Sequence, residues 1–142
     1  MATTRTASAH WEGSLMEGAG QVTLTSSGLG TFDVTWASRA QTPDGRTSPE
    51  ELIAAAHSTC FSMALSLALA QAGNPATSID TSAAVTFQPG TGITGIALTV
   101  TGAVPGLTGE QFAQAAEGAK TGCPVSQALA AVPITLEAHF RD

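Results

Sequence analysis

A long apolar segment with clearly marked ends is the feature that most constrains this chain. Ser48 suits the N-cap of a helix, Pro49 suits its first position, and Glu51, three residues after Ser48, completes a capping box. Gly73 and Pro75 mark the other end, because glycine accepts the left-handed conformation there and proline prevents continuation. These signals predict a helix about 36 Å long, enough to cross a whole domain.

The predicted helix, residues 49–72, is apolar around most of its circumference. Ala, Leu, Ile, Phe and Met occupy most positions from Leu52 to Ala70, interrupted by small hydroxyl residues and His57. We expect this helix to be buried on most sides. Cys60 lies at its middle. The polar interruptions favour a core helix of a soluble protein over a membrane span.

Segments of alternating polarity on both sides of this helix predict strands. A weak strand is expected at 6–11. It is followed by a predicted hairpin, in which a turn at 26–30 joins the strand around Val22 and Leu24 to the strand around Phe32 and Val34. A second hairpin is expected around the turn at 89–92. The alternating sets are Val22/Leu24, Phe32/Val34/Trp36, Ala83/Val85/Phe87, Ile96/Leu98/Val100 and Ile134/Leu136/Ala138/Phe140.

Two shorter helices are predicted between the second hairpin and the last strand. Thr108 can cap the first, with Gln111 reaching back, and this helix ends near Gly122. Pro124 suits the first position of the second, which runs through Ala130.

The order of the elements predicts an α+β fold with antiparallel sheet. At 142 residues the chain suits one domain, 1–142. Within it, residues 1–47 hold the first strands and an arginine-bearing loop, and 48–142 hold helix, hairpin, helix and strand.

The charge of the chain argues against nucleic acid as a partner. The formal net charge is -6, with 5 Lys and Arg against 11 Asp and Glu, and no basic cluster is present. The first ten residues lack the pattern of a signal peptide. We therefore expect a cytoplasmic protein that binds neither nucleic acid nor membrane.

Cys60 would need a nearby cation to react as a thiolate. Burial in an apolar helix raises a thiol pKa, and the field of the helix end fades within a turn. Arg39 and Arg46 lie in the predicted loop 39–47, so one of them is expected to reach the sulfur, and Glu50 is the better placed carboxylate to orient it. One difficulty is that about 15 Å of helical rise separates Glu50 from Cys60.

Cys123 presents the opposite situation. It directly precedes Pro124, so the free N–H groups at the start of a helix would favour its thiolate. Residue chemistry alone therefore favours Cys123 as the nucleophile. The alternative is that Cys60 and Cys123 are both small buried hydrophobes, with neither a disulfide scaffold nor zinc spacing.

His57 and several large apolar residues have more than one interpretation. His57 lies three residues before Cys60 on one helical face, where it could act as a base or pair in a metal site, but a packing or dimer-contact role is favoured. The apolar residues could line a substrate pocket, although such residues more often form the core. They are Phe32, Trp36, Phe61, Met63 and Phe87.

Three segments of the chain resemble the osmotically inducible protein C (OsmC) branch of the OsmC/organic hydroperoxide resistance family. They are 9–13 (AHWEG), 48–66 (SPEELIAAAHSTCFSMALS) and 122–129 (GCPVSQAL). The resemblance implies that Cys60 is the peroxidatic cysteine and Cys123 the resolving one. It places the activating arginine on Arg39, with Arg46 as the alternative, and the orienting glutamate on Glu50.

The resemblance also implies a function and an assembly. The function is a thiol peroxidase that reduces organic hydroperoxides, and hydrogen peroxide less readily, through a Cys60–Cys123 disulfide in oxidative or osmotic stress defence. An external dithiol, typically of dihydrolipoyl type, regenerates the thiols, and no metal or cofactor is required. The implied assembly is an intertwined homodimer whose antiparallel sheets wrap the long central helices, with sites at the subunit boundary.

Two other functions stay open from the residues alone. One is a non-catalytic structural protein with inert thiols, and the other is a thioesterase-like binder of acyl ligands.

Overall fold

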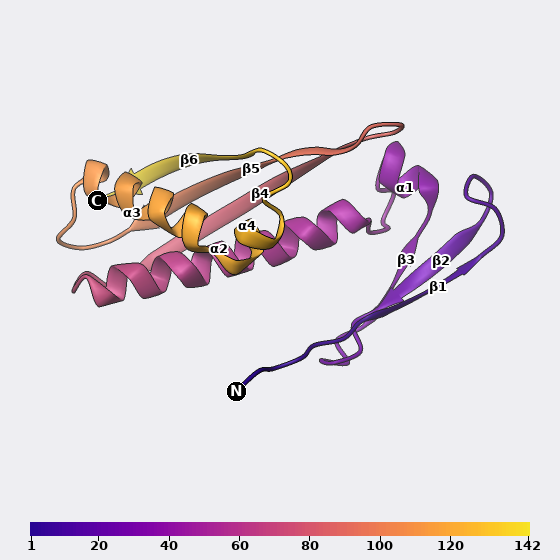
Figure 1. The fold of residues 1–142 in the computed structure, drawn as a ribbon, viewed down its shortest axis with the longest axis horizontal. Helices are drawn as coiled ribbons and strands as arrows, with labels where there is room; N and C mark the ends of the chain where they lie inside the picture. Colours follow the sequence, from indigo (N-terminus) through magenta and orange to yellow (C-terminus); the bar gives the residue numbers. More distant parts are fainter. The chain divides into compact units, whose positions relative to one another are not determined.

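The computed structural model describes all residues from Met1 to Asp142 (Figure 1). Contacts divide the chain into an N-terminal unit, Met1–Leu52, and a C-terminal unit, Ile53–Asp142. The elements in chain order are β1 (Ser8–Glu12), β2 (Ala19–Thr23), β3 (Thr31–Val34), α1 (Trp36–Ala40), α2 (Pro49–Gln71), β4 (Ser78–Gln88), β5 (Gly92–Ala103), α3 (Gly109–Gly122), α4 (Pro124–Ala128) and β6 (Ile134–Arg141). The expected α+β class is confirmed, and the single domain 1–142 stays a prediction.

The N-terminal unit is built on an antiparallel sheet in the order β1-β2-β3. Val22 of β2 pairs with Ala9 on one side and with Phe32 on the other, so the predicted hairpin and the weak first strand are both present. Within one chain this unit has almost no core. Of its residues only Gly20, Ser38 and Glu50 are buried.

Trp36 does not continue β3, as the alternation predicted, and Arg39 does not lie in a loop. Thr35 instead caps the short helix α1, whose residues include both. The Ser38 N–H donates to Thr35 Oγ1 at 3.0 Å, and the Thr35 N–H donates to Ser38 Oγ at 3.0 Å. This capping box ends the strand, because the two side chains accept from the Thr35 and Ser38 N–H groups, which would otherwise be available for pairing with a neighbouring strand.

Helix α2 begins and ends close to where the sequence predicts. The Glu51 N–H donates to Ser48 Oγ at 3.1 Å, so Ser48 is the N-cap. The return bond of a capping box does not form, because the Glu51 carboxylate accepts from the Thr47 hydroxyl at 2.6 Å instead. The helix ends at Gln71, and Gly73 follows with φ of 88°, in the left-handed region.

The C-terminal unit contains a sheet in the order β4-β5-β6. Strands β4 and β5 form the predicted antiparallel hairpin, but β6 pairs with β5 in parallel. The expectation of a purely antiparallel sheet is therefore wrong. The chain passes through α3 and α4 after β5, and this helical crossover lets β6 run in the same direction as its neighbour (Figure 1).

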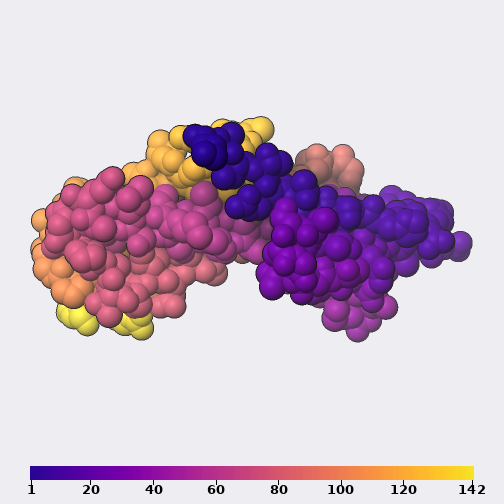
Figure 2. Space-filling model, turned by 90° about the horizontal axis from the view of Figure 1, so that it is seen from below, coloured from indigo at the N-terminus to yellow at the C-terminus, as the bar shows by residue number.

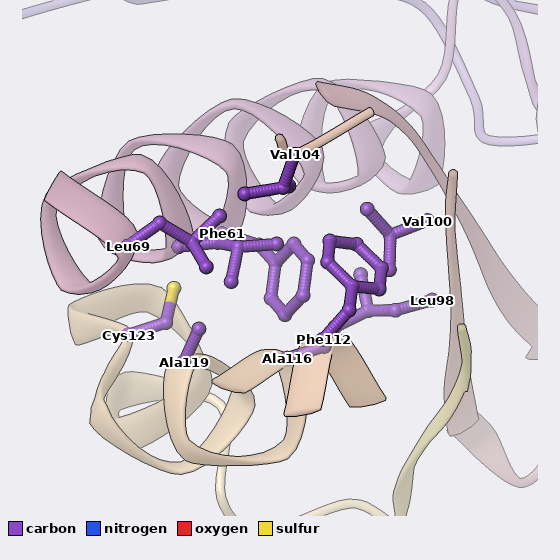
Figure 3. Packing of buried hydrophobic residues seen from close by; sticks show 10 residues of the cluster. Phe61, Leu69, Leu98, Val100, Val104, Phe112, Ala116, Ala119 and Cys123 are labelled. Carbon is purple, nitrogen blue, oxygen red and sulfur yellow. The ribbon is translucent and has the colours of Figure 1, made fainter. Parts of the chain in front are cut away.

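The hydrophobic core lies between α2, α3 and one face of this sheet (Figure 3). Residues spaced four apart on α2 supply one stripe, formed by His57, Phe61, Leu65 and Leu69, all buried. Phe112 on α3 packs against this stripe and against the β5 residues Leu98 and Val100. The core residues are Phe61, Leu65, Leu69, Leu98, Val100, Val104, Phe112, Ala116, Ala119 and Cys123.

Helix α2 is not buried on most sides within one chain, contrary to the expectation. Met63 is 67% exposed and Leu67 is 59% exposed, and much of the helix is visible in magenta in the space-filling view (Figure 2). By length and composition alone, α2 could also cross a membrane. Core helices of soluble proteins share that character, and Phe61, Leu65 and Leu69 are core residues here.

Candidate active site

The fold brings the two cysteines together within the C-terminal unit. Cys60 lies in the middle of α2, and Cys123 lies between the end of α3 and the start of α4. Both thiols are free. Cys123 is buried in the core cluster and Cys60 packs against that cluster. The two side chains lie close enough that each influences the pKa of the other.

The position of Cys123 follows from two helix ends that meet at one residue. Its N–H donates to Ala119 O at 2.8 Å and closes α3, and its carbonyl accepts from the Gln127 N–H at 3.0 Å and opens α4. Pro124 occupies the first turn of α4, as predicted. The Cys123 sulfur points toward α2 (Figure 3). A reactive group is thus held by backbone bonds on both sides.

The surroundings of the two sulfurs shift their pKa values in opposite directions. Burial raises the pKa of Cys60. The Val125 N–H lowers this pKa in part, and the neighbouring Cys123 raises it further. Burial is also the largest influence on Cys123, but the nearby Ser126 N–H, Cys60 thiol, Ser126 hydroxyl and Val125 N–H together outweigh it, so the pKa of Cys123 is lowered. Within one chain, Cys123 is therefore the more readily ionised sulfur.

The predicted arginine and glutamate meet in the N-terminal unit. Arg39 Nε donates to Glu50 Oε1 at 2.9 Å and to Oε2 at 3.2 Å, and its Nη2 donates to Oε2 at 3.1 Å. Glu50 is 7% exposed, so this is a sheltered, charge-assisted pair. Arg46 is bound elsewhere, with Nη1 at 3.5 Å from the Asp44 carboxylate and 3.3 Å from the Asp44 carbonyl oxygen. The catalytic roles of Arg39 and Glu50 stay predictions.

His57 is fully buried, and its partner is a residue that sequence reasoning missed. Its Nε2 lies 2.7 Å from Ser126 Oγ, and its Nδ1 has no hydrogen-bond partner. Burial lowers the pKa of His57, which keeps the ring neutral near pH 7. The sequence signal for Ser126 was its spacing, because it follows the N-cap Cys123 by three residues and the side chains at these positions face each other.

A groove of about 800 Å³ opens beside Cys60 in the C-terminal unit. Its lining is mostly apolar and small, formed by Cys60, Met63, Ala64, Leu67, Ala68, Gln71, Ala115, Gly118, Ala119, Gly122 and Pro124. Of the predicted pocket residues, Met63 lines this groove, whereas Phe61 is buried in the core. Trp36 lines a different apolar pocket of about 430 Å³ in the N-terminal unit, beside Arg39.

Comparison with known proteins places this geometry in a family. The sequence pattern described as OsmC-like protein matches residues 42–137, which include Glu50 and both cysteines. The chain belongs to the OsmC family. The match covers most of the chain and confirms the resemblance drawn from the three sequence segments.

One relative within the OsmC family is the protein named peroxiredoxin OsmC from Escherichia coli. It is 46% identical over 137 residues, which cover 94% of each chain. Among solved structures, an organic hydroperoxide resistance protein from Elizabethkingia anophelis is 25% identical, with a TM-score of 0.69 over 99% of this chain and 100% of that one. An OsmC-like protein from Mycoplasma pneumoniae, 10% identical, matches the fold with a TM-score of 0.74 over 100% of both chains.

Proposed function

We propose that this OsmC-family chain is a thiol peroxidase that reduces organic hydroperoxides, with Cys60 and Cys123 as its redox pair. The observation that carries the proposal is that the fold brings two free thiols, 63 positions apart in sequence, close enough for each to influence the pKa of the other. The relative from Escherichia coli is named a peroxiredoxin, and the one from Elizabethkingia an organic hydroperoxide resistance protein. A pair of adjacent thiols is what a sulfenic acid needs to become a disulfide.

The reaction would take three steps. The Cys60 thiolate attacks the outer oxygen of ROOH, the O–O bond breaks, and the departing alkoxide takes a proton, which leaves Cys60 as sulfenic acid and ROH as product. Cys123 then attacks the Cys60 sulfur, so that an S–S bond forms and water departs. A dithiol finally reduces the disulfide and is itself oxidised to a disulfide.

The first step requires a cation at Cys60 that its own C-terminal unit does not supply. Burial raises the pKa of Cys60, and no positively charged side chain is among the influences that lower it. Ten residues of continuous helix, about 15 Å of rise, separate Glu50 from Cys60. We propose that the Arg39–Glu50 pair of a second copy of the chain supplies the charge, which would stabilise the thiolate and then the alkoxide.

Two features of the single chain support such a homodimer. The outward face of α2 carries exposed Met63 and Leu67, and a soluble chain gains stability by covering such a face. The N-terminal unit contains no buried large hydrophobic residue, although Trp11, Leu15, Val22 and Leu52 line an apolar pocket there. An intertwined arrangement in which each copy covers the other would bury both surfaces.

The groove beside Cys60 supports an organic substrate. Its alanines and glycines leave space, and Met63 and Leu67 offer apolar contacts to the organic group of a hydroperoxide. We further propose a dithiol of dihydrolipoyl type as the reductant. A cytoplasmic location with a role in oxidative or osmotic stress is part of the same proposal.

The test is hydroperoxide consumption by the purified full chain. Wild type with dihydrolipoamide should consume cumene hydroperoxide and tert-butyl hydroperoxide catalytically, and Cys60→Ser should not. Cys123→Ser should consume no more than about three hydroperoxides per chain, as Cys60 is oxidised through sulfenic to sulfinic and sulfonic acid, and then stop. Peroxide consumption by Cys60→Ser equal to that of wild type would overturn the proposal, and so would a wild-type protein that consumes none.

A further inference from the structure

A buried polar pair, each member three residues from one of the cysteines, has no part in the steps above. His57 Nε2 and Ser126 Oγ are 2.7 Å apart, and both residues are buried, with exposed fractions of 0% and 5%. They join α2 to α4 across 69 positions of sequence. A polar contact in a core of this kind costs free energy unless its hydrogen bonds are well made, so it calls for a physical explanation.

Ser126 links this pair to Cys123. Cys123 is the N-cap of α4 and Ser126 is its third helical residue, positions whose side chains face each other across the first turn. No ordinary side-chain capping bond to the backbone forms there. The Ser126 hydroxyl is therefore placed on the side of the helix start that carries the sulfur, and it is among the nearby groups that lower the pKa of Cys123.

The number of available protons determines the direction of each bond. The Ser126 hydroxyl has one proton, and it favours the Cys123 thiolate only if it donates that proton to the sulfur. Ser126 Oγ must then accept from His57, so the neutral ring carries its proton on Nε2. This assignment leaves Nδ1 as a bare acceptor, in agreement with its lack of a partner. In the opposite tautomer the Ser126 hydroxyl would donate its proton to His57 Nε2, and it could not donate to the Cys123 thiolate.

We propose that His57 and Ser126 are positioning residues for the resolving cysteine, which they hold as a thiolate through the chain of bonds His57 Nε2–H to Ser126 Oγ–H to Cys123 Sγ. This inference rests on the proposed function and adds to it a device for the second step. Cys123 Sγ⁻ attacks the sulfenic sulfur of Cys60, the S–S bond forms and the S–O bond breaks. The departing hydroxide takes one proton, equal to the one that Cys123 released on ionising, and leaves as water.

Few other ionisable groups act on Cys123. From α2 these are Cys60, which influences its pKa directly, and His57 through the serine. On α3 the preceding Lys120 is paired with Glu117 at 3.1 Å, and no charged side chain is among the influences on the pKa of Cys123. Changes at Ser126 or His57 should therefore be visible in the titration of this one sulfur.

The experiment uses Cys60→Ser, which leaves Cys123 as the single cysteine and keeps a hydroxyl donor beside it. Thiolate absorbance in the ultraviolet is followed against pH, with Cys60→Ser/Cys123→Ser subtracted as the blank. Adding Ser126→Ala or His57→Leu should lower the thiolate fraction at a fixed pH below the pKa by about tenfold, the effect of losing one hydrogen bond to a charged group. Adding Ser126→Thr or His57→Gln, which keep the hydroxyl or the N–H, should restore most of it.

A second measurement follows the two chemical steps in chains with both cysteines. A hydroperoxide pulse without dithiol is quenched over time, and mass spectrometry gives the sulfenic, sulfinic and disulfide forms. Ser126→Ala should keep the rate of the first oxidation, slow disulfide formation by about tenfold and increase over-oxidation of Cys60.

The outcomes separate the inference from the proposed function. An unchanged Cys123 titration in both Ser126→Ala and His57→Leu overturns the inference. It is also overturned if Ser126→Thr and His57→Gln change the titration as much as Ser126→Ala and His57→Leu do, because that result would indicate an effect of packing alone. If Ser126→Ala does not fold, the two His57 variants decide by the same criteria. A wild-type chain that consumes no hydroperoxide but whose Cys123 responds as predicted overturns the peroxidase and leaves the bond chain standing.

Discussion

The Arg39 guanidinium forms a bidentate pair with the Glu50 carboxylate, with Nε 2.9 Å from Oε1 and Nη2 3.1 Å from Oε2. Only one of the two candidate arginines is oriented in this way, because Arg46 turns to Asp44. A guanidinium fixed by a nearly buried carboxylate keeps a defined orientation, as a group that stabilises a thiolate and an alkoxide must.

Removal of this guanidinium should impair the reaction of Cys60 while the matched loop arginine should not. Arg39→Ala is expected to lower kcat/KM for cumene hydroperoxide by about a hundredfold or more, since a preorganised cation is lost. Arg39→Lys should recover little, because lysine cannot form the fork with Glu50. Arg46→Ala is the control and should stay within about twofold of wild type. Equal losses in Arg39→Ala and Arg46→Ala would contradict the assignment.

The outward face of α2 should be an interface. Leu67 is 59% exposed in the single chain, so a homodimer that covers it should be broken by Leu67→Glu, which places a charge in an apolar contact. Light scattering should give twice the chain mass for wild type and a single chain mass, or a concentration-dependent mixture, for the variant. Leu29→Glu, at a 79% exposed turn position, is the control. A monomeric wild-type chain with full activity would rule out a site shared between copies.

Close packing between β5 and α3 predicts that two glycines of β5 differ strongly in how much stability the protein loses when each is replaced by alanine. A Cβ atom at Gly102 would overlap the ring of Phe112, whereas one at Gly95 would lie 3.5 Å from the Pro133 carbonyl oxygen, an ordinary contact. Gly102→Ala should therefore lower the free energy of unfolding by about 1–3 kcal/mol and Gly95→Ala by less than about 1 kcal/mol. Urea denaturation followed by circular dichroism measures both. Similar values for the two variants would show that Phe112 has room to move.

His57 should make stability depend on pH in a defined direction. Burial lowers its pKa from the ordinary value of 6.5, so the unfolded chain binds a proton more readily than the folded one. The stabilisation is therefore fully present above pH 6.5 and is lost as the pH falls from there through the lower pKa of the folded state. His57→Gln should flatten this part of the stability profile, whereas His139→Gln, whose ring is exposed, should leave it unchanged. An unaltered slope in His57→Gln would mean that the ring is accessible to protons.

Local signals in the sequence predicted the ends of the helices well. Ser48 and Gly73 bound α2 as expected, and Thr108 and Gln111 form the reciprocal bonds of a capping box at 3.1 and 3.0 Å. Such signals work because the satisfaction of free backbone groups at a helix end depends on residues a few positions apart. The same locality explains one error, since Thr35 and Ser38 form a cap that an alternating pattern through Trp36 concealed.

Relationships across the chain were harder to predict. Nothing in the alternation of Ile134 to Phe140 distinguishes a parallel partner from an antiparallel one, because both bury the same face. The contact between His57 and Ser126 depends on how α4 packs on α2, and spacing along the chain does not give it. Residue chemistry did indicate the opposite pKa shifts of the two cysteines, since burial and free N–H groups can be inferred from Cys60 in an apolar helix and Cys123 before a proline.

The identity of the sulfur that meets the peroxide tests the central claim most directly. In the single chain Cys123 is the more readily ionised thiol, so an attack by Cys60 requires the proposed cation. Each single-cysteine variant is treated with excess cumene hydroperoxide and analysed by peptide mass spectrometry. We predict rapid conversion of Cys60 to sulfinic and sulfonic acid in Cys123→Ser and an inert Cys123 in Cys60→Ser. Rapid oxidation of Cys123 in Cys60→Ser, with an inert Cys60 in Cys123→Ser, would contradict the account.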